Sequence, residues 1–184
     1  MASGCERAAW TIIREATPDD APGIARVHVD TWRATYSSFI PAEYLARMSH
    51  ERSTGMFQSL LKRNPPGTKT FVADAGAGTG IVGASTGGYN DLGHDDYQAE
   101  LIGIYVLPAF QRHGIGRQLV KAVKDHLLRL EARGMLVWVF ADNPNRSFYG
   151  HLGGTLVEEK WEETGGKMLK RLALGWKDVR DVRV

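Results

Sequence analysis

The sequence predicts an α/β (α+β) fold in which a mixed sheet of about seven strands carries helices on both faces. Three observations support this prediction. An apolar run at 98–108 leads through a glycine-rich turn into an amphipathic helical run at 114–133, and a second apolar run at 135–141 follows directly. Short β runs on either side of this unit come in pairs separated by glycine turns. The 184 residues show no internal repeat or linker, so we expect one domain over 1–184, with 1–9 as a flexible tail.

The N-terminal half is predicted to hold one strand, three helices and a pair of strands. These elements are a strand at 10–16, helices at 18–36, 41–48 and 49–64, and strands at 69–75 and 80–88. Thr17 and Pro18 suit a helix cap and a first helical position. The glycine cluster at 76–80 lies between two strands with no helix after it, so we expect a hairpin turn there rather than a phosphate loop.

The C-terminal half alternates strands with helices and ends in a hairpin. Its elements are a strand at 98–108, a helix at 114–133, a strand at 135–141, a short helix at 143–154, and strands at 155–163 and 167–176. The long helix is the clearest element because its apolar residues share one stripe at helical spacing, and Gly134 is expected to end it. That stripe consists of Ile115, Leu119, Ala122, Val123, His126, Leu127 and Leu130. The tail at 177–184 is expected either to fray or to pair with a second copy of the chain.

Composition and charge argue against several classes of function. The formal charge of +2, without a basic run interleaved with aromatic residues, gives no support for a nucleic-acid partner. The N-terminus lacks the apolar core of a signal peptide, and no stretch approaches 18 consecutive apolar residues, so we expect a cytoplasmic protein with no membrane partner. The single cysteine, Cys5, excludes an intramolecular disulfide. The histidines show no metal-ligand spacing with carboxylates or cysteine, so we expect no metal.

Two glycines, Gly114 and Gly116, stand where the apolar run meets the amphipathic helix. The first turn of a helix has free N–H groups, and the helix dipole adds about half a positive charge there. Glycines allow an anion to approach the backbone itself, and Arg112 and Arg117 can add charge-assisted hydrogen bonds. The sequence therefore predicts an anion-binding loop, although an ordinary helix start with a glycine turn remains the alternative.

The features that this loop lacks narrow the choice of anion. It has no Gly-Lys-Ser/Thr ending, so the lysine that contacts the terminal phosphates of a nucleoside triphosphate is missing. It also lacks the third glycine of the dinucleotide fingerprint, and no acidic residue ends a following strand to hold a ribose. Nucleotide-hydrolase and dehydrogenase interpretations are both disfavoured.

Two stretches at the right separation resemble the Gcn5-related N-acetyltransferase (GNAT) superfamily. Gln-Arg-His-Gly-Ile-Gly at 111–116 is similar to the family's Gln/Arg-x-x-Gly-x-Gly/Ala motif, and 143–154 is similar to its Asn-led helix with Phe-Tyr and Leu-Gly. Residues 28–45 look like the paired helices that cover the acceptor site in bacterial members. Gly154 departs from the aromatic residue that often follows Leu-Gly. The resemblance covers nearly the whole chain from residue 10 and implies a GNAT-like, mostly antiparallel sheet.

The resemblance implies acetyl-CoA as co-substrate and suggests which residues hold it. The loop at 111–117 would bind the pyrophosphate, and the backbone of 104–106 would face the pantetheine arm. Of two asparagines, one would bond the pantetheine while the other caps the following helix. The expected cofactor-binding residues are therefore Ile104, Tyr105, Val106, Gln111, Arg112, His113, Gly114, Ile115, Gly116, Arg117, Asn143 and Asn145.

Acetyl transfer to an amine needs a base and an acid, because an alkyl ammonium with a pKa of about 10.4 is mostly protonated at pH 7 and the departing thiolate needs a proton. Glu100 lies four residues before Ile104, where several family members carry a catalytic glutamate; the alternative is a strand-edge carboxylate that faces water. His94 and its two acidic neighbours at 95–96 could serve instead or simply form a polar turn. Tyr149 matches the family tyrosine whose hydroxyl meets the coenzyme sulfur; the alternative is a packing residue.

Three aromatic residues, Trp32, Tyr36 and Phe39, are expected to line the acceptor pocket, although core packing would explain Trp32 equally well. The resemblance implies an acyltransferase that moves an acetyl group from acetyl-CoA to a primary amine of a small molecule, by direct transfer in a ternary complex. The rival functions are acetylation of a protein N-terminus or lysine, and a CoA-binding module without turnover. Family members are often dimers, so a homodimer is a further expectation.

Overall fold

The computed structural model describes residues 11–89 and 95–184, so the expectations about the tail at 1–9, Cys5 and His94 lie outside it. Within the described residues, one seven-stranded sheet has the order β1-β2-β3-β4-β5-β7-β6. The strands are β1 Ile12–Glu15, β2 Lys69–Asp74, β3 Ile81–Tyr89, β4 Ala99–Val106, β5 Met135–Phe140, β6 Thr155–Thr164 and β7 Lys167–Trp176. The helices are α1 Ala21–Tyr36, α2 Ala42–Arg47, α3 His50–Arg63, α4 Ile115–Arg129 and α5 Ser147–His151.

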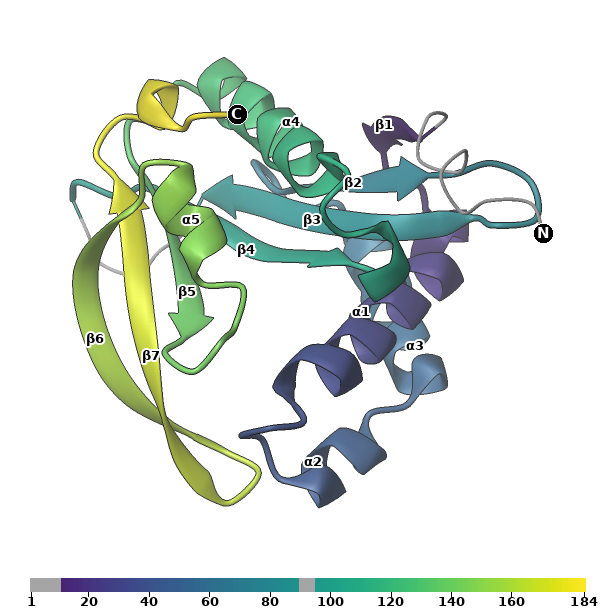
Figure 1. The fold of residues 1–184 in the computed structure, drawn as a ribbon. Coiled ribbons are helices and arrows are strands. Elements are labelled where there is room, and N and C mark those ends of the chain that lie inside the picture. The colour runs from purple at the N-terminus through teal and green to yellow at the C-terminus, as the bar shows by residue number, and fades with distance from the viewer. Residues whose placement is uncertain (1–10, 90–94) are drawn as a thin grey trace.

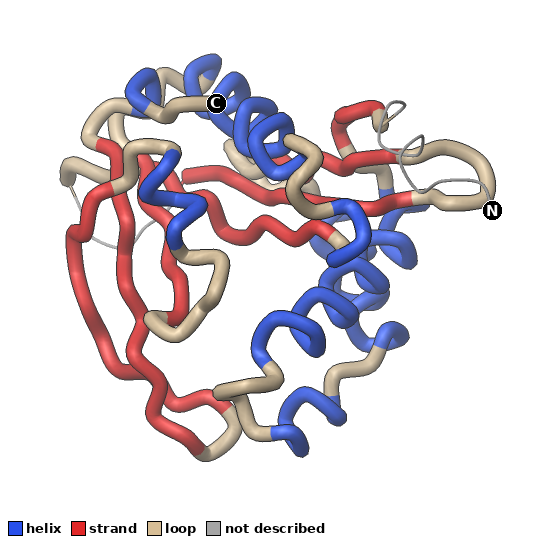
Figure 2. The backbone as a smooth tube through the Cα atoms, in the orientation of Figure 1, coloured by secondary structure: helices blue, strands red, loops and turns tan. Residues whose placement is uncertain are grey.

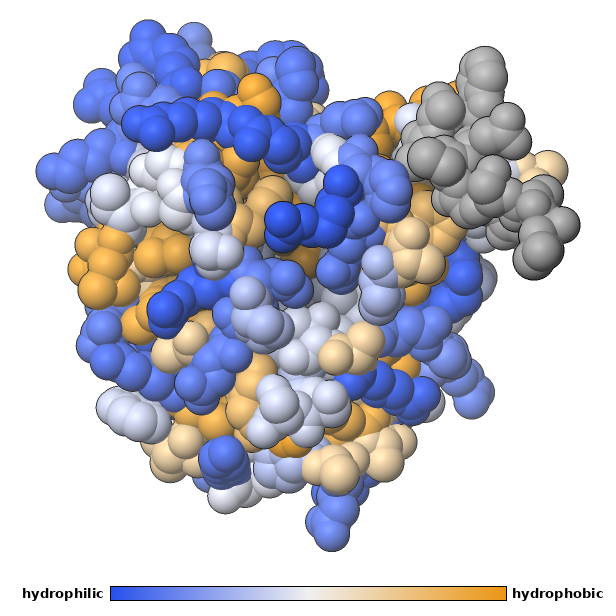
Figure 3. Space-filling model, in the orientation of Figure 1, coloured by the Kyte–Doolittle hydropathy of each residue, from blue (hydrophilic) through white to orange (hydrophobic). Residues whose placement is uncertain are grey.

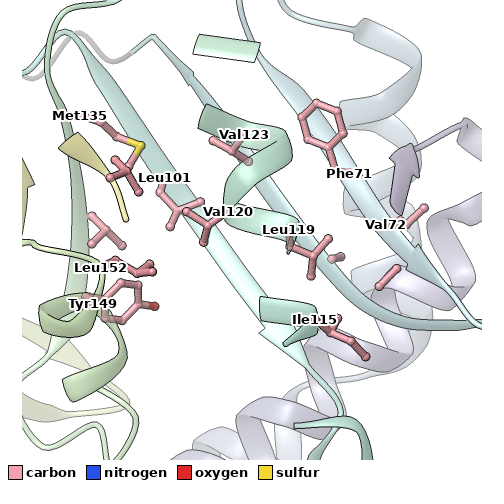
Figure 4. Close-up of a cluster of buried hydrophobic side chains, with 14 of the residues drawn as sticks. Phe71, Val72, Leu101, Ile115, Leu119, Val120, Val123, Met135, Tyr149 and Leu152 are labelled. Atoms are coloured by element: carbon pink, nitrogen blue, oxygen red, sulfur yellow. The ribbon is translucent and has the colours of Figure 1, made fainter. Parts of the chain in front are cut away.

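The sheet is mixed and mostly antiparallel, as expected, because only β4 and β5 run parallel. Helices cover both of its faces: α4 and α5 lie on one side, and α1 with α3 lies on the other (Figures 1 and 2). The predicted stripe of α4 faces the sheet, where Leu119 and Val123 are fully buried with Leu101 and Met135 (Figure 4). Val120, which was not part of that stripe, is fully buried as well. This packing of helix against sheet forms the larger of two hydrophobic clusters.

The sheet opens between its two central strands. Parallel pairing of β4 with β5 is confined to Ala99↔Met135 and Glu100↔Leu136, and beyond that point the two strands diverge (Figure 1). The β6–β7 hairpin bends around the opening, and its tip reaches the connection between α1 and α2 (Figure 1). Lys167 Nζ donates to Phe39 O at 3.1 Å there. The hairpin tip and the α1–α2 connection therefore close one side of the opening.

Two expected helix boundaries were wrong. Helix α4 ends at Arg129 rather than near residue 133, because Glu131 adopts a left-handed φ of 59° and Ala132 N–H returns to Leu127 O at 3.1 Å. The helix expected from residue 143 starts only at Ser147, after a turn.

The C-terminal tail is packed rather than frayed. Val179 and Val182 are 0% and 2% exposed, and Lys124 Nζ on α4 donates to the carbonyls of Arg180 and Val182. The missing aromatic at Gly154 is also explained by packing. Trp176 of β7 lies so close that a Cβ at Gly154 would meet its ring at 2.8 Å, so a residue distant in sequence supplies the aromatic surface.

Candidate active site

The opening between β4 and β5 presents backbone N–H groups that no strand takes up. Leu107 N–H donates to Val82 O on β3 at 2.9 Å, and N–H directions alternate along a strand, so the N–H of Tyr105 also turns to β3. By the same alternation, the N–H groups of Ile104 and Val106 turn toward the opening. Two of the three residues expected to offer backbone groups here do so, and the third, Tyr105, contributes its side chain instead.

The glycine-containing loop lies at one end of the opening. Gln111 Nε2 donates to Val106 O at 2.9 Å, which ties the loop to the end of β4. Gly114 caps α4 with a φ of 81°, a left-handed conformation that glycine adopts without strain, and a Cβ there would meet no atom within 4 Å. Gly116 lies against Phe148, and Ile115 is buried, so both can contribute only backbone to a ligand.

The three basic side chains of the loop, Arg112, His113 and Arg117, are all exposed. Arg112 has a φ of 65°, which is unusual for a residue with a side chain. Arg117 already donates one N–H to Arg183 O at 3.0 Å in the packed C-terminal tail. The Arg112 side chain makes no hydrogen bond or ion pair within the described residues, so Arg112 is the freer of the two arginines at the predicted anion site.

The two asparagines before α5 have different roles. Asn143 is buried, and its Oδ1 accepts from Asn145 N–H at 2.8 Å, so Asn143 fixes the turn that follows β5. The Asn145 side chain is exposed. Of the pair, Asn143 is the structural residue and Asn145 is the one free to meet a ligand.

Tyr149 is carried by α5 on the α4 side of the sheet. Its ring lies beside Leu152 with the hydroxyl directed away from α5 (Figure 4), and the residue is only 7% exposed. Burial raises the pKa of this phenol, and the nearby phenols of Tyr36 and Tyr105 raise it further. Those two tyrosines come from the opposite side of the sheet, so the Tyr149 hydroxyl is close enough to sense groups across the opening.

Glu100 occupies the last β4 position that pairs with β5, immediately before the strands diverge. It is half-buried, and this burial raises the pKa of its carboxyl; Arg171 and Lys160 act in the opposite direction. A carboxylate with a raised pKa is a better proton acceptor than an exposed one. This environment differs from that of a strand-edge carboxylate facing water.

The three aromatic residues expected around the acceptor form one cluster on the α1 side of the sheet. Tyr36 and Phe39 have ring centroids 5.4 and 5.6 Å from that of Phe140 on β5, and Trp32 lies at 6.1 Å from it. All three are only partly buried. They pack against the smaller hydrophobic cluster, which agrees with the core-packing interpretation, and their place in an acceptor pocket stays a prediction.

The structure adds residues that local sequence patterns did not indicate. The Tyr105 side chain points to the α1 side, where its ring centroid lies 4.9 Å from that of His28, and burial raises the pKa of its hydroxyl. The indole N–H of Trp32 partly offsets this rise but does not reach hydrogen-bond geometry. Trp138 and Arg171 join the same face from β5 and β7. Alternation along β5 could have indicated Trp138, but Arg171 depends on the pairing of distant strands.

The surroundings of the site are mixed in polarity. In space-filling view, hydrophobic surface shows between hydrophilic side chains near the centre of the face that contains the opening (Figure 3). A separate hollow of about 220 Å³ lies between β2 and the end of α3, lined by residues that include Glu15, Leu60 and Lys69, and shares none of the residues above.

Among the described residues, no three acidic, histidine or cysteine side chains gather as a metal would need. No described helix has the length and apolar character needed to cross a membrane.

Comparison with known proteins identifies the family to which this chain belongs. The model of the acetyltransferase (GNAT) family matches residues 29–153. The uncharacterized N-acetyltransferase YuaI of Bacillus subtilis (strain 168) is 35% identical over 167 residues, which cover 91% of this chain and 93% of the relative. The PaiA N-acetyltransferase of Thermoplasma acidophilum, solved in complex with coenzyme A, superposes with a TM-score of 0.67 at 18% identity, covering 88% of this chain and 97% of that one. YncA of Salmonella typhimurium, solved with acetyl-CoA, gives a TM-score of 0.66 at 19% identity, covering 90% and 92%. This chain belongs to the GNAT acetyltransferase family and is an N-acetyltransferase.

Proposed function

We propose that this enzyme transfers an acetyl group from acetyl-CoA to a primary amine of a small molecule, directly and within a ternary complex. The observation that carries this proposal is the opening between β4 and β5. It has free N–H groups along one edge, the glycine loop at one end, and Tyr149 and Glu100 associated with its two sides. The solved relatives that contain coenzyme A or acetyl-CoA support the choice of acyl donor.

The residues around the opening fit acetyl-CoA. Space above Gly114 and the exposed cation of Arg112 suit a pyrophosphate at the helix N-terminus. The N–H groups of Ile104 and Val106 suit an extended chain that adds along β4 like a further strand. Asn145 is free to bond the same chain, and one strand N–H can polarise a thioester carbonyl. When bound, acetyl-CoA supplies the activated acetyl thioester.

In this proposal the residues of the chain position the reactants and transfer protons. Glu100 takes a proton from the ammonium of the acceptor, directly or through a water, so that the free amine can form the new bond to the acetyl carbon. Burial keeps Tyr149 protonated, so its hydroxyl can donate to the sulfur as the carbon–sulfur bond breaks. The ammonium loses two protons in all, one to Glu100 before attack and one from the nitrogen after the new bond forms. The sulfur gains one proton from Tyr149, so each turnover releases one proton to solvent as Glu100 is deprotonated and Tyr149 is reprotonated.

The hairpin supports a small acceptor over a protein segment. Its tip rests on the α1–α2 connection through Lys167 and Phe39, and a Cβ at Gly165 would meet Tyr44 at 2.8 Å. Contacts this close leave little room for an extended peptide between the two. The rings of Trp32 and Tyr36, whose centroids lie 4.9 Å apart, would then bound the acceptor on the α1 side.

The test is release of free thiol from acetyl-CoA in the presence of polyamines, amino acids, aminoglycosides or short peptides. We expect turnover with a class of small amines, and loss of most of that turnover in Tyr149→Phe. Stabilisation of the protein against heat by acetyl-CoA, measured alongside, separates binding from turnover. Turnover confined to peptides would overturn the small-molecule assignment, and strong stabilisation without any turnover would indicate a module that only binds.

A further inference from the structure

Arg171 on β7 is held rigidly on the α1 side of the sheet. Its guanidinium lies 4.7 Å from the centre of the Phe140 ring, and one terminal N–H donates to Trp138 O at 3.2 Å. The other terminal nitrogen lies 3.6 Å from Glu162, and the side chain is 21% exposed. Its Nε, by contrast, is buried and finds no acceptor among the described residues. A fixed, partly satisfied guanidinium therefore presents a free donor.

Trp138 on β5 carries a second buried donor on the same face of the sheet. The indole Nε1 of Trp138 is buried and is likewise without an acceptor in the described part of the chain. Lys160 Nζ stacks over the same indole, 4.2 Å from the ring centre, and Lys160 is the cross-strand partner of Arg171. A buried donor without a partner destabilises the folded protein, and such donors are rare in native proteins. Their concentration on one face indicates a place where a ligand supplies acceptor oxygens.

The groups around these donors carry both signs of charge. The carboxylate of Glu162 lies 3.4 Å from Lys160 and 3.6 Å from Arg171, and Glu158 lies on the same face of β6 as Lys160. Glu100 on β4 is paired with Leu136 on β5. Trp138 lies two residues after Leu136 on the same strand, so its side chain is on the same face of the sheet as that of Leu136. Burial raises the pKa of Glu100, and Arg171 and Lys160 oppose the rise, so the three charges act on one another.

This arrangement complements a zwitterion. An ammonium group would be attracted to Glu100, where its proton is to be removed, while a carboxylate in the same molecule would meet Arg171 and Trp138. A polyamine carries no acceptor oxygen, so the donors of Arg171 and Trp138 would remain without a partner. The site thus discriminates by charge between two kinds of small amine.

We propose that Arg171, with Trp138, binds a carboxylate of the acceptor, so that the substrate is an amine that also carries a carboxylate. This inference rests on the proposed function, because it names the acceptor class of the same site. Arg171 acts here as a specificity-determining residue: it holds the end of the acceptor remote from the reacting nitrogen.

The experiment compares matched pairs of acceptors, each an amino acid and the amine left after removal of its carboxylate, by thiol release from acetyl-CoA. We expect the wild type to prefer the acid in kcat/KM. Arg171→Gln should raise KM for the acid about 10- to 100-fold, the scale of a lost hydrogen bond to a charged group. It should change KM for acetyl-CoA by no more than about twofold and should raise KM for the decarboxylated amine far less than KM for the acid. Because Arg171 opposes the rise in the pKa of Glu100, the pH profile should shift upward for both acceptors alike.

Lys170→Gln is the matched control. Lys170 is adjacent on β7 but on the other face of the sheet, where it pairs with Glu159 at 2.6 Å. The control should leave the preference for the acid intact. Equal rates for acid and amine in the wild type, a preference for polyamines, or equal effects of the two variants would overturn the inference and leave the acetyltransferase proposal standing.

A binding measurement keeps the two proposals separate. With coenzyme A bound, amino acids should raise the Tm of the wild type more than their decarboxylated partners do, and Arg171→Gln should abolish the difference. Thiol release from no amine at all would count against the proposed function. Absence of any difference in Tm would count against the carboxylate site, whatever the turnover.

Discussion

Replacing His28 with phenylalanine should flatten the acid side of the stability profile. His28 lies in α1 among aromatic rings, with centroids 4.9 Å from Tyr105, 5.5 Å from Phe57 and 5.7 Å from Trp32. Desolvation in this setting lowers the pKa of the imidazole from its usual 6.5 to about 4. Phenylalanine keeps the aromatic packing and cannot take up a proton.

The magnitude follows from linkage between protonation and folding. Between pH 6.5 and about 4 the unfolded chain binds a proton at His28 that the folded chain does not. Stability from this site is therefore complete above pH 6.5 and declines as the pH falls toward 4. One pKa unit corresponds to about 1.4 kcal/mol, so the whole shift is worth about 3 kcal/mol.

The assay is urea unfolding of the wild type and His28→Phe between pH 7.5 and pH 4, with His151→Gln as a control on an exposed histidine. The free energy of unfolding of the wild type should fall by about 3 kcal/mol more than that of His28→Phe over this range. The control should follow the wild type. Parallel curves for wild type and His28→Phe would refute the idea that His28 is buried in its neutral form beside the site.

Four further outcomes follow from the same contacts. Tyr149→Phe should lower kcat by about 10²-fold or more with little change in KM for acetyl-CoA, and an unchanged rate would remove Tyr149 from the acid role. Glu100→Gln should abolish the acidic limb of the pH profile of kcat/KM, which burial places above the ordinary carboxyl range; a persisting limb would assign it to another group. Gly114→Ala should cost about 1 kcal/mol in urea unfolding because φ is 81°, whereas no loss would mean that the loop relaxes. Val182→Ala should cost about 2 kcal/mol because the tail is packed, and a frayed tail would show no change.

Most of the fold could be predicted from the sequence because its signals are local. The stripe of α4, the apolar runs of β4 and β5 and the glycine turns of the two hairpins each occupy one short stretch, and all gave the correct element. The C-terminal tail gave no such signal. Val179 and Val182 are two apolar residues in a charged run. Only the packing of the tail beside α4 shows that they are buried.

The candidate site divides in the same way. The glycine loop, Glu100 and Tyr149 lie in or beside recognisable motifs, so their places could be named in advance. Arg171 could not, because its position depends on the pairing of Phe140 with Arg171 across β5 and β7. The N–H of Tyr105 turns toward β3, whereas the N–H groups of Ile104 and Val106 turn toward the opening. This difference likewise depends on the register of β4 with β3. The pairing of strands that are distant in the sequence places these groups. The periodicity within a single segment does not reveal that pairing.

The central claim, that the opening and its glycine loop bind acetyl-CoA, is tested most directly by calorimetric titration with acetyl-CoA. Wild type should bind one molecule per chain, and Arg112→Gln should bind about tenfold more weakly, the scale of one charge-assisted hydrogen bond. Arg129→Gln, an exposed arginine at the far end of α4, should bind like the wild type. Absence of binding to the wild type, or equal weakening by the two substitutions, would contradict the account.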